Sequence, residues 1–286
     1  MSKVNNSEYG SGANSLPVIK IRPPRGWILI NLGELWEYRE LIYFLTWRDI
    51  KIRYKQTVLG FAWAILQPFL MMVVFSLFFG NLLNVSSNGI PYPLFSYAAL
   101  LPWTLFAQGI TRASESLVGN VNMVQKVYFP RLILPLSSIL APMVDFAIAF
   151  FILIGMMFYY GYPPTMKIFW LLPFIMLALL TACGFGLWLS ALNVKYRDIR
   201  YAVPFIIQLW LFASPVVYSS SVIPARFQAI YGLNPMVGVI EGFRWALLGS
   251  KPPELSVTVS AVVVVVILIS GLFYFRFNEK TFADEI

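Results

Sequence analysis

The sequence is poor in the residues on which most soluble enzymes depend. It contains no histidine and a single cysteine, Cys183. Histidine is the commonest metal ligand and the commonest base at neutral pH, and one cysteine forms neither an internal disulfide nor a CxxC metal site. Charged residues make up only 12% of the 286-residue chain, about half of the roughly 25% that soluble domains carry. These absences exclude an ordinary water-soluble globule.

Nucleotide-binding and hydrolytic motifs are also missing from the 286 residues. The chain has no GxxxxGK[ST] phosphate-binding loop, no GxGxxG, no HExxH and no GxSxG. Each of these motifs places a backbone cradle, a metal ligand or a nucleophile where its chemistry requires it. We therefore predict a chain that is not an enzyme, with no catalytic residue, metal site or cofactor of its own. Any use of ATP is expected on a second polypeptide.

Long apolar runs are what the sequence does contain. Hydrophobic residues make up 59% of the chain, and the mean hydropathy is +0.72. A helix needs about 20 apolar residues to cross a bilayer core about 30 Å thick. Six runs approach that length, and the second and fifth are the shortest: 61–83, 94–110, 133–160, 168–192, 201–218 and 257–275. The predicted fold is an all-α membrane protein with six transmembrane helices.

The distribution of basic residues predicts the orientation. If the six runs alternate across the membrane, 17 of the 21 lysines and arginines fall on one side and four on the other. Basic residues concentrate on the cytoplasmic side of membrane proteins. Both termini are therefore expected in the cytoplasm. The same bias accounts for the net charge of +8, so binding to nucleic acid is not needed to explain it.

Residues 35–55 follow a polar tail at 1–34, expected to be flexible, and have the pattern of an amphipathic helix. At 100° per residue one side collects Leu35, Tyr38, Leu41, Ile42, Leu45 and Ile52, and the other collects Glu37, Glu40, Arg48, Lys51 and Lys55. Such a helix would lie at the cytoplasmic membrane surface. A simple solvated helix without a further role is the alternative. Residues 56–286 then form the six-span domain.

The external loop at 219–254 has two moderately apolar stretches. The second includes Glu241 and Arg244, and two charges at mid-membrane would cost several kcal/mol. Counting this stretch as a span would also reverse the predicted orientation of the C-terminus. Re-entrant or interfacial helices fit better, and an ordinary external loop is the alternative.

Asp145 is the acidic residue that lies well inside a predicted span. An intramembrane carboxylate usually faces a helix interface, a water-filled path or a partner charge. A functional site and a structural hydrogen bond are both open interpretations.

Six short motifs occur in order between position 35 and the C-terminus. They are 53–60 (RYKQTVLG) followed by Trp63 and 67–68 (QP), 100–103 (LLPW), 126–131 (KVYFPR), 192–194 (LNV) with 197–199 (RDI), 214–218 (SPVVY) and 234–236 (NPM). Together with the topology they closely resemble the polysaccharide-export permeases of the ABC-2 type. Members of that family export O-antigen, capsule or teichoic acid. One motif alone would be weak, but six in this order are specific.

The resemblance implies an assembly and a place for it. Family members are six-span half-transporters that form homodimers in the cytoplasmic (inner) membrane. Each pairs with a separate ATP-binding subunit, present in two copies, which binds ATP and Mg²⁺. The cargo is a lipid-linked polysaccharide. Residues 35–55 match the interface helix of the family, and 114–125 match the coupling helix that docks in a cleft of the ATPase.

The resemblance also implies roles for individual residues. The coupling residues are Glu115, Asn120, Asn122 and Lys126. The polymer path runs between two protomers along the first and fifth spans, which gives Trp63, Phe69, Trp210, Phe212 and Tyr218 as wall residues. Aromatic side chains can stack on sugars there or serve as ordinary membrane-interface anchors. Glu241 and Arg244 fall in the re-entrant helices at the exit and are candidates for an external gate.

Other functions remain open at this point. An ABC-2 exporter of another lipid or small molecule would keep the topology and change the cargo. An ion-coupled flippase of lipid-linked sugars would use Asp145 as its relay. A membrane-embedded glycosyltransferase would need paired carboxylates for a metal ion, and Glu241 and Glu254 are too far apart in the sequence to argue for one.

Overall fold

The computed structural model describes residues 32–55, 60–252 and 254–285. Within these ranges the regular structure is helical and no strand is present. The predicted tail at 1–34 therefore lies almost wholly outside the described residues, as do positions 56–59 of the first motif. The first helix begins at Leu32, three residues before the predicted interface helix.

The helices follow one another with short connections. In chain order they are α1 (Leu32–Glu37), α2 (Arg39–Lys55), α3 (Gly60–Phe75) with its π-helical continuation η1 (Ser76–Leu82), α4 (Tyr92–Glu115), the 3₁₀ turn η2 (Val118–Asn120), α5 (Val121–Lys126), α6 (Ile133–Leu140), α7 (Met143–Tyr159), η3 (Met166–Trp170), α8 (Leu171–Lys195), α9 (Ile199–Phe212), η4 (Ser220–Val222), α10 (Ala225–Gly232), α11 (Pro235–Leu248), α12 (Glu254–Asn278) and α13 (Phe282–Glu285).

Each of the six predicted apolar runs contains helix, although the fifth is helical only to Phe212 and continues as turns to residue 218. Four helical segments are long and apolar enough to cross a bilayer. These four are Ala62–Leu82, Ile133–Tyr159, Met166–Lys195 and Ser256–Asn278. The two shortest predicted runs correspond to α4 and α9. The 14 residues of α9 would extend only about 21 Å at 1.5 Å per residue. The described chain is thus a bundle with several membrane-length helices.

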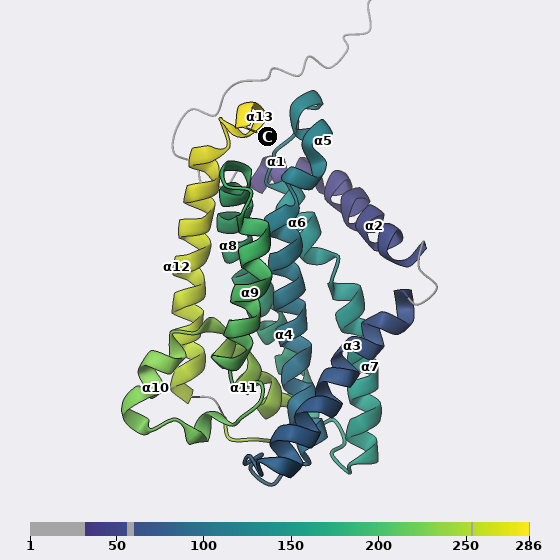
Figure 1. Cartoon of the computed structure of the whole chain (residues 1–286), viewed down its shortest axis with the longest axis vertical. Coiled ribbons are helices and arrows are strands. Elements are labelled where there is room, and N and C mark those ends of the chain that lie inside the picture. Colours follow the sequence, from purple (N-terminus) through teal and green to yellow (C-terminus); the bar gives the residue numbers. More distant parts are fainter. Residues whose placement is uncertain (1–31, 56–59, 253, 286) are drawn as a thin grey trace, which may run out of the picture.

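Helix α4 is the centre of the bundle (Figure 1). It packs against α3, α6, α7, α8, α9 and α11, and most of its side chains are buried, including Tyr97, Leu101 and Phe106. A helix surrounded by other helices meets little lipid, which explains why its hydropathy is lower than that of the outer helices. Helix α8 packs on one side of α4 and carries α12 on its outer side, and α3 and α7 pack on the other side of α4.

Small residues allow α8 and α12 to approach closely. A Cβ atom at Gly271 would lie 2.4 Å from the carbonyl oxygen of Gly184, so both helices need glycine at this crossing. One turn away, the rings of Trp188 and Tyr274 stack with centroids 4.4 Å apart. Trp188 Nε1 also donates to Ser270 Oγ over 3.2 Å. These contacts hold the C-terminal helix against the bundle.

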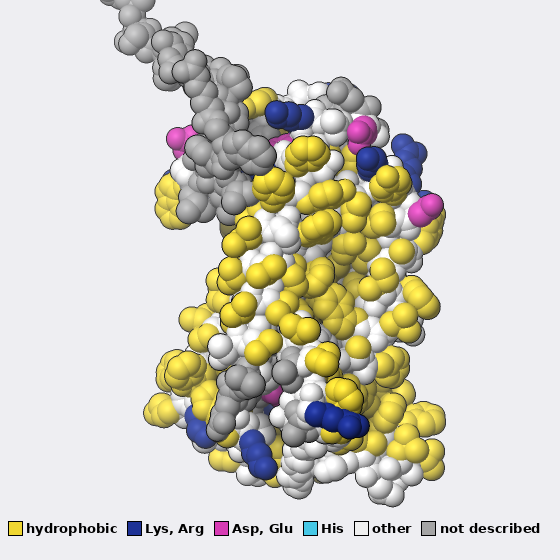
Figure 2. All heavy atoms as spheres, turned by 90° about the vertical axis from the view of Figure 1, so that its left-hand side faces the viewer, with side chains coloured by type: hydrophobic (Ala, Val, Ile, Leu, Met, Phe, Trp, Pro, Cys, Tyr) yellow, Lys and Arg dark blue, Asp and Glu magenta, His cyan; other side chains and the backbone are white. Residues whose placement is uncertain are grey.

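Two ends of the bundle can be distinguished. The α5 end holds η2, α5 and α13, and the α11 end holds α10, α11 and the turns around them (Figure 1). On the face shown in Figure 2, charged side chains gather at these two ends, and apolar side chains cover the middle. A belt of this kind matches the apolar core of a bilayer.

Helix α2 runs obliquely from the α5 end along α6 towards mid-height of the bundle (Figure 1). The predicted apolar side faces the protein at Leu35, Tyr38, Leu41, Ile42 and Leu45, of which Leu45 is buried. Ile52 departs from the pattern, because its side chain is 61% exposed. The outer side of α1 and α2 is aromatic and exposed, with Trp36, Tyr43, Phe44 and Trp47.

Candidate functional site

The predicted coupling segment, 114–125, is a turn followed by a short helix. Helix α4 ends at Glu115, η2 follows, and α5 forms one and a half turns at the α5 end. Glu115, Asn122 and Lys126 are exposed on this surface. Asn120 differs from them, since it is half-buried and its Nδ2 donates to the Ser116 carbonyl over 2.8 Å. Asn120 therefore shapes the turn, and the other three residues are available to a partner.

The coupling segment is connected to three other parts of the chain. Buried Asn193, from the LNV motif on α8, donates to the Ser114 carbonyl over 2.8 Å. Arg48 of α2 lies 3.8 Å from Met123 Sδ. Helix α13 packs against α5. Movement of the coupling segment would therefore act directly on α2, α8 and the C-terminal helix.

Asp145 lies in the first turn of α7 and forms an ion pair with Arg53 at the end of α2. Arg53 Nη1 lies 2.5 Å from Asp145 Oδ2, and the Tyr54 hydroxyl donates to Asp145 Oδ1. Arg53 Nη1 also donates to Gln108 Oε1 of α4 over 3.0 Å. Burial, and next the hydrogen bond to Asp145, raise the pKa of Tyr54, so the phenol keeps its proton. The intramembrane carboxylate thus faces a helix interface with a partner charge.

The predicted path residues fall into two groups. Trp63 and Phe69 on α3 and Phe212 on α9 are exposed on the surface of the chain, at 49%, 40% and 51%. Other large exposed hydrophobic residues lie along the same two helices, including Leu66 and Leu70 on α3 and Phe205 and Leu209 on α9. Surfaces this apolar face either lipid or another protein. The exposure of these three residues does not distinguish lipid from a second protomer, so their role along a path stays a prediction.

Trp210 and Tyr218 point into the chain. The Trp210 ring packs edge-on between Phe185 and Phe106, with centroids at 4.8 and 5.1 Å, and its Nε1 donates to Asn234 Oδ1 over 3.0 Å. Tyr218 is half-buried and donates to the Phe212 carbonyl over 3.2 Å. Both rings support the walls of the bundle, and their roles along a path stay predictions.

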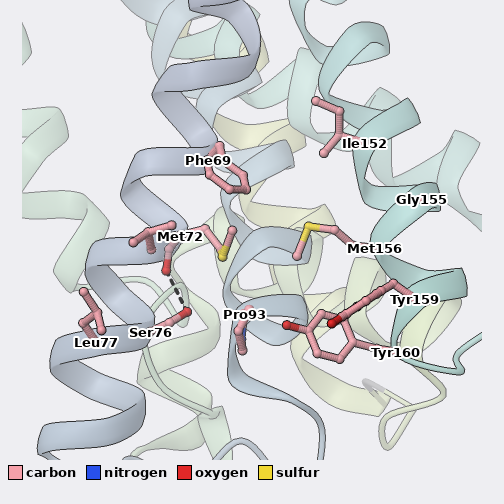
Figure 3. A pocket seen from close by; sticks show the side chains of 11 residues that line it. Phe69, Met72, Ser76, Leu77, Pro93, Ile152, Gly155, Met156, Tyr159 and Tyr160 are labelled. Carbon is pink, nitrogen blue, oxygen red and sulfur yellow. Dashed lines mark hydrogen bonds between the residues drawn. The ribbon is translucent and has the colours of Figure 1, made fainter.

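Phe69 also lines a groove between α3 and α7. The groove has a volume of about 610 Å³. Figure 3 shows Phe69 and Leu77 on the α3 side, with Ile152, Met156 and Tyr160 opposite them on the α7 side. The Ser76 hydroxyl donates to the Met72 carbonyl over 2.7 Å, so its polarity is satisfied locally. The lining is almost wholly apolar and suits a hydrocarbon chain better than a sugar.

Helices α10 and α11 lie within residues 219–254, and the re-entrant and external placement of these helices stays a prediction. Helix α11 is inserted among α4, α8 and α12, and nearly all its residues are buried. A Cβ atom at Gly242 would lie 2.2 Å from the Phe174 ring. Helix α10 packs beside α12 and is more exposed.

Arg244 is buried within this region and holds several backbone segments together. Its guanidinium donates to the carbonyls of Pro215 (2.6 Å), Val216 (2.9 Å), Tyr218 (3.3 Å) and Phe95 (3.3 Å). Its Cζ also lies 3.4 Å from the Phe95 ring centroid. Burial lowers the pKa of Arg244 to about 9, so the group remains charged at neutral pH. Backbone carbonyls therefore compensate the buried charge.

Glu241 is not paired with Arg244. Its Oε2 accepts a hydrogen bond from Ser256 of α12 over 2.8 Å, and no ion pair within 4.0 Å joins the two residues in the described chain. Burial raises the pKa of Glu241, and the Ser256 hydrogen bond and Arg244 oppose that effect. The two residues predicted as an external gate are therefore one structural clamp and one carboxylate at a pocket.

Sequence reasoning missed the role of Asn234. Its Oδ1 caps α11 by accepting from Met236 N and also binds Trp210 Nε1. Its Nδ2 donates to the Ala213 carbonyl and to Ser214 Oγ. The NPM motif, in which asparagine precedes proline at a helix start, was a signal for an N-cap. The motif connects α9, the SPVVY turn and α11.

Comparison with known proteins identifies the family. The ABC-2 type transporter family matches residues 40–248. The chain belongs to this family. Its relatives include the O-antigen export system permease protein RfbA of Klebsiella pneumoniae, 29% identical over 255 residues that cover 89% of this chain and 96% of the relative. RfbA of Myxococcus xanthus is 30% identical over 258 residues, which cover 88% of this chain and 98% of the relative. The polysialic acid transport protein KpsM of Escherichia coli is 24% identical over 239 residues, which cover 82% of this chain and 91% of the relative.

Membership of the ABC-2 family agrees with the composition and the fold. The relatives are permease subunits of transporters and not enzymes, as the missing catalytic motifs predict. Several apolar helices of membrane length make the ABC-2 chain a multi-pass membrane protein. The resemblance inferred from the six motifs is confirmed.

Proposed function

We propose that this chain is the permease subunit of an ATP-driven exporter that moves a lipid-linked polysaccharide across the cytoplasmic membrane. The observation that carries the proposal is the similarity to O-antigen export permeases along nearly the whole of both chains. Similarity confined to a few helices would support only the fold. The cargo class is proposed by analogy with relatives whose names specify O-antigen or polysialic acid.

The proposed topology has six spans with both termini in the cytoplasm. Four helices have the length and hydropathy of spans. In this arrangement α4 is the second span, shielded from lipid by its neighbours, and α9 with the turn that follows it is the fifth. The α5 end is then cytoplasmic. Helices α1 and α2 lie at that membrane surface, with the exposed aromatic residues Trp36, Phe44 and Trp47 among lipid headgroups.

The proposed assembly is a homodimer with two copies of a separate ATP-binding subunit. The missing phosphate-binding loop supports a separate ATPase. The exposed Glu115, Asn122 and Lys126 on the coupling segment are the proposed contacts with it. The exposed apolar faces of α3 and α9 supply the proposed wall between protomers. Closure of the ATPase would move α5, and α2 and α8 would follow as rigid bodies.

Deletion of the gene in the producing cells tests the function directly. We expect the surface polysaccharide to disappear and lipid-linked polymer to accumulate inside. Re-expression of the full chain should restore the surface polymer. Surface polysaccharide that persists at its normal amount after deletion would overturn the proposal.

A second experiment tests the coupling segment. The full chain with Glu115→Ala, Asn122→Ala and Lys126→Ala would be co-expressed with the ATP-binding subunit, and export and co-purification would be measured. We expect both to fall severalfold. Arg226→Ala, an exposed cation at the α11 end, is the matched control and should change neither. Unchanged export together with unchanged co-purification would remove the coupling assignment.

A further inference from the structure

A pocket with a mixed polar and apolar lining and a volume of about 490 Å³ opens at the α11 end of the bundle. Small-molecule sites have volumes of roughly 300–1,000 Å³. The turn before α4, the 219–221 turn, α10, α11 and the start of α12 all contribute to its walls. Neither the coupling segment nor the groove between α3 and α7 shares a lining residue with it.

The pocket combines hydroxyl, amide and carboxylate groups with apolar surface. Its polar lining includes Asn88, Ser219, Gln228, Tyr231 and Glu241, and its apolar lining includes Ile90, Val237 and Val259. A sugar ring has the same division, because hydroxyls surround its edge and C–H groups cover its faces. Amide and carboxylate groups can bond to two neighbouring hydroxyls at once.

Some of the polar groups shape the pocket. Asn88 Nδ2 donates to Ser219 Oγ over 2.9 Å, and Ser221 Oγ donates to the same oxygen over 2.9 Å. Ser256 fixes Glu241 through Oε2 over 2.8 Å. These bonds join the turn before α4 to the 219–221 turn and fix one side of the Glu241 carboxylate. The pocket is therefore built before a ligand arrives.

Other polar groups remain available. No described residue hydrogen-bonds to Glu241 Oε1, to the side-chain amide of Gln228 or to the Lys251 ammonium group. They supply acceptors and donors for several hydroxyls of one ligand. In a pocket of this size these groups could engage the same sugar unit.

The charge distribution favours a neutral ligand. The buried Arg244 also lines the pocket, but its guanidinium donates to four backbone carbonyls and covers the Phe95 ring. Glu241 and Lys251 bring one charge of each sign to the lining, and the third charge, that of Arg244, is already compensated by backbone carbonyls. An acidic sugar would bring its carboxylate towards Glu241 at a cost.

A hydrogen bond connects the pocket to the proposed polymer path. The Tyr231 hydroxyl donates to the Tyr218 hydroxyl over 3.1 Å, and Tyr218 in turn donates to the carbonyl of Phe212, a proposed wall residue. A sugar bound beside Tyr231 would therefore lie next to the end of the path.

From this geometry we propose that the pocket at the α11 end binds one neutral, hydroxyl-rich sugar unit of the exported glycan. Glu241 Oε1 and Gln228 hold the hydroxyls, and the apolar lining contacts a ring face. This inference rests on the proposed function, which makes the α11 end external. The pocket would then hold the leading part of the polymer as it emerges.

Direct binding tests the pocket. The full chain in lipid nanodiscs would be titrated with neutral gluco-, manno- and galacto-tetrasaccharides, with tetragalacturonate as the acidic comparison, and binding followed by saturation-transfer NMR. We expect at least one neutral probe to bind saturably. Glu241→Gln and Gln228→Ala should each weaken that binding about tenfold, as the loss of a hydrogen bond with a charged or buried group predicts.

The variants are chosen so that a loss of binding can be distinguished from misfolding. Glu241→Gln keeps an acceptor for Ser256, so its melting temperature should not fall below that of the native chain. Thr165→Ala, an exposed polar residue at the same end and outside the pocket, should bind the sugar normally. Absence of binding by every neutral probe, tighter binding of tetragalacturonate, or binding unaffected by both pocket variants would each overturn the inference.

The export assay separates this inference from the proposed function. In one outcome, gene deletion removes the surface polysaccharide, but Glu241→Gln and Gln228→Ala bind sugar and export polymer normally. This outcome would reject the sugar site and keep the proposed function. In the opposite outcome, both variants lose sugar binding, but gene deletion leaves the surface polysaccharide unchanged. This outcome would reject the proposed function and keep the pocket as a sugar site.

Discussion

Arg53 at the end of α2 forms an ion pair with Asp145 at the start of α7, with Nη1 and Oδ2 2.5 Å apart. The two residues belong to elements far apart in the sequence, and Asp145 is only 6% exposed. Gln108 of α4 joins the pair through Arg53. The contact therefore fixes the inner end of the oblique helix α2 to the core of the bundle.

Asp145→Asn should destabilise the chain by roughly 3–5 kcal/mol, because it leaves the arginine charge without its partner in a largely buried site. Arg53→Gln should have a similar cost. The double variant should recover part of the loss, since neither charge then remains. Thermal unfolding of the purified full chain in detergent measures all three. Strictly additive losses would show that the two residues do not act together.

Transport with Asp145→Asn separates the exporter from the ion-coupled alternative. An exporter driven by a separate ATPase should retain ATP-dependent transport, in proportion to the amount of folded protein, with or without a proton gradient. Proteoliposomes with the ATP-binding subunit allow both conditions. Transport that requires the gradient and disappears in Asp145→Asn would instead favour a proton relay.

Arg244→Met should destabilise the α11 end strongly, because four carbonyls that now accept from the guanidinium lose their donors. Each buried carbonyl left without a donor costs about 1–3 kcal/mol. Arg244→Lys should recover only part of the loss, since an ammonium group lacks the planar fork of arginine. Limited proteolysis at residues 213–222, together with the melting temperature, measures the effect. Native resistance to protease in Arg244→Met would contradict the clamp.

Gly242→Ala should destabilise the insertion of α11, because the new Cβ atom would lie 2.2 Å from the Phe174 ring. Overpacking of this kind costs about 1–3 kcal/mol. Gly155→Ala on α7 is the matched control, since a Cβ atom added there would have open space within 4 Å and alanine favours a helix. Thermal unfolding should therefore show a loss for Gly242→Ala and none for Gly155→Ala.

The dependence of the chain's stability on pH should reveal the raised pKa of Glu241. Its pKa is raised in the folded chain above the ordinary value of 4.5. The folded state therefore holds the proton more tightly than the unfolded state, and stability falls as the pH rises from 4.5 through the folded pKa. The Glu241→Gln variant has no titratable group at this position. As the pH rises from 4.5 through the folded pKa, the melting temperature of the native chain should therefore fall relative to that of the variant. A difference that is constant with pH would contradict the raised pKa.

The sequence predicted the helices better than the contacts between them. Apolar length was enough to locate α3, α7, α8 and α12, because those helices face lipid. Helix α4 was harder to delimit, since a surrounded helix needs less hydropathy. The cost of placing Arg244 in a membrane argued against a span, and α11 is not among the four helices of membrane length. The burial of Arg244, in contrast, depends on carbonyls that only the folded chain brings together. The partner of Asp145 depends on tertiary structure in the same way.

The position of α13 has a practical consequence. Arg131 N and Arg276 Nη1 both bond to the Glu279 carboxylate, Phe282 is buried against Phe275, and α13 lies beside α5. An affinity tag or fluorescent protein fused after Ile286 would stand next to the surface proposed for the ATPase. We expect such fusions to capture less ATPase than fusions to the N-terminus, which makes the choice of tagged end decisive for isolating the intact transporter.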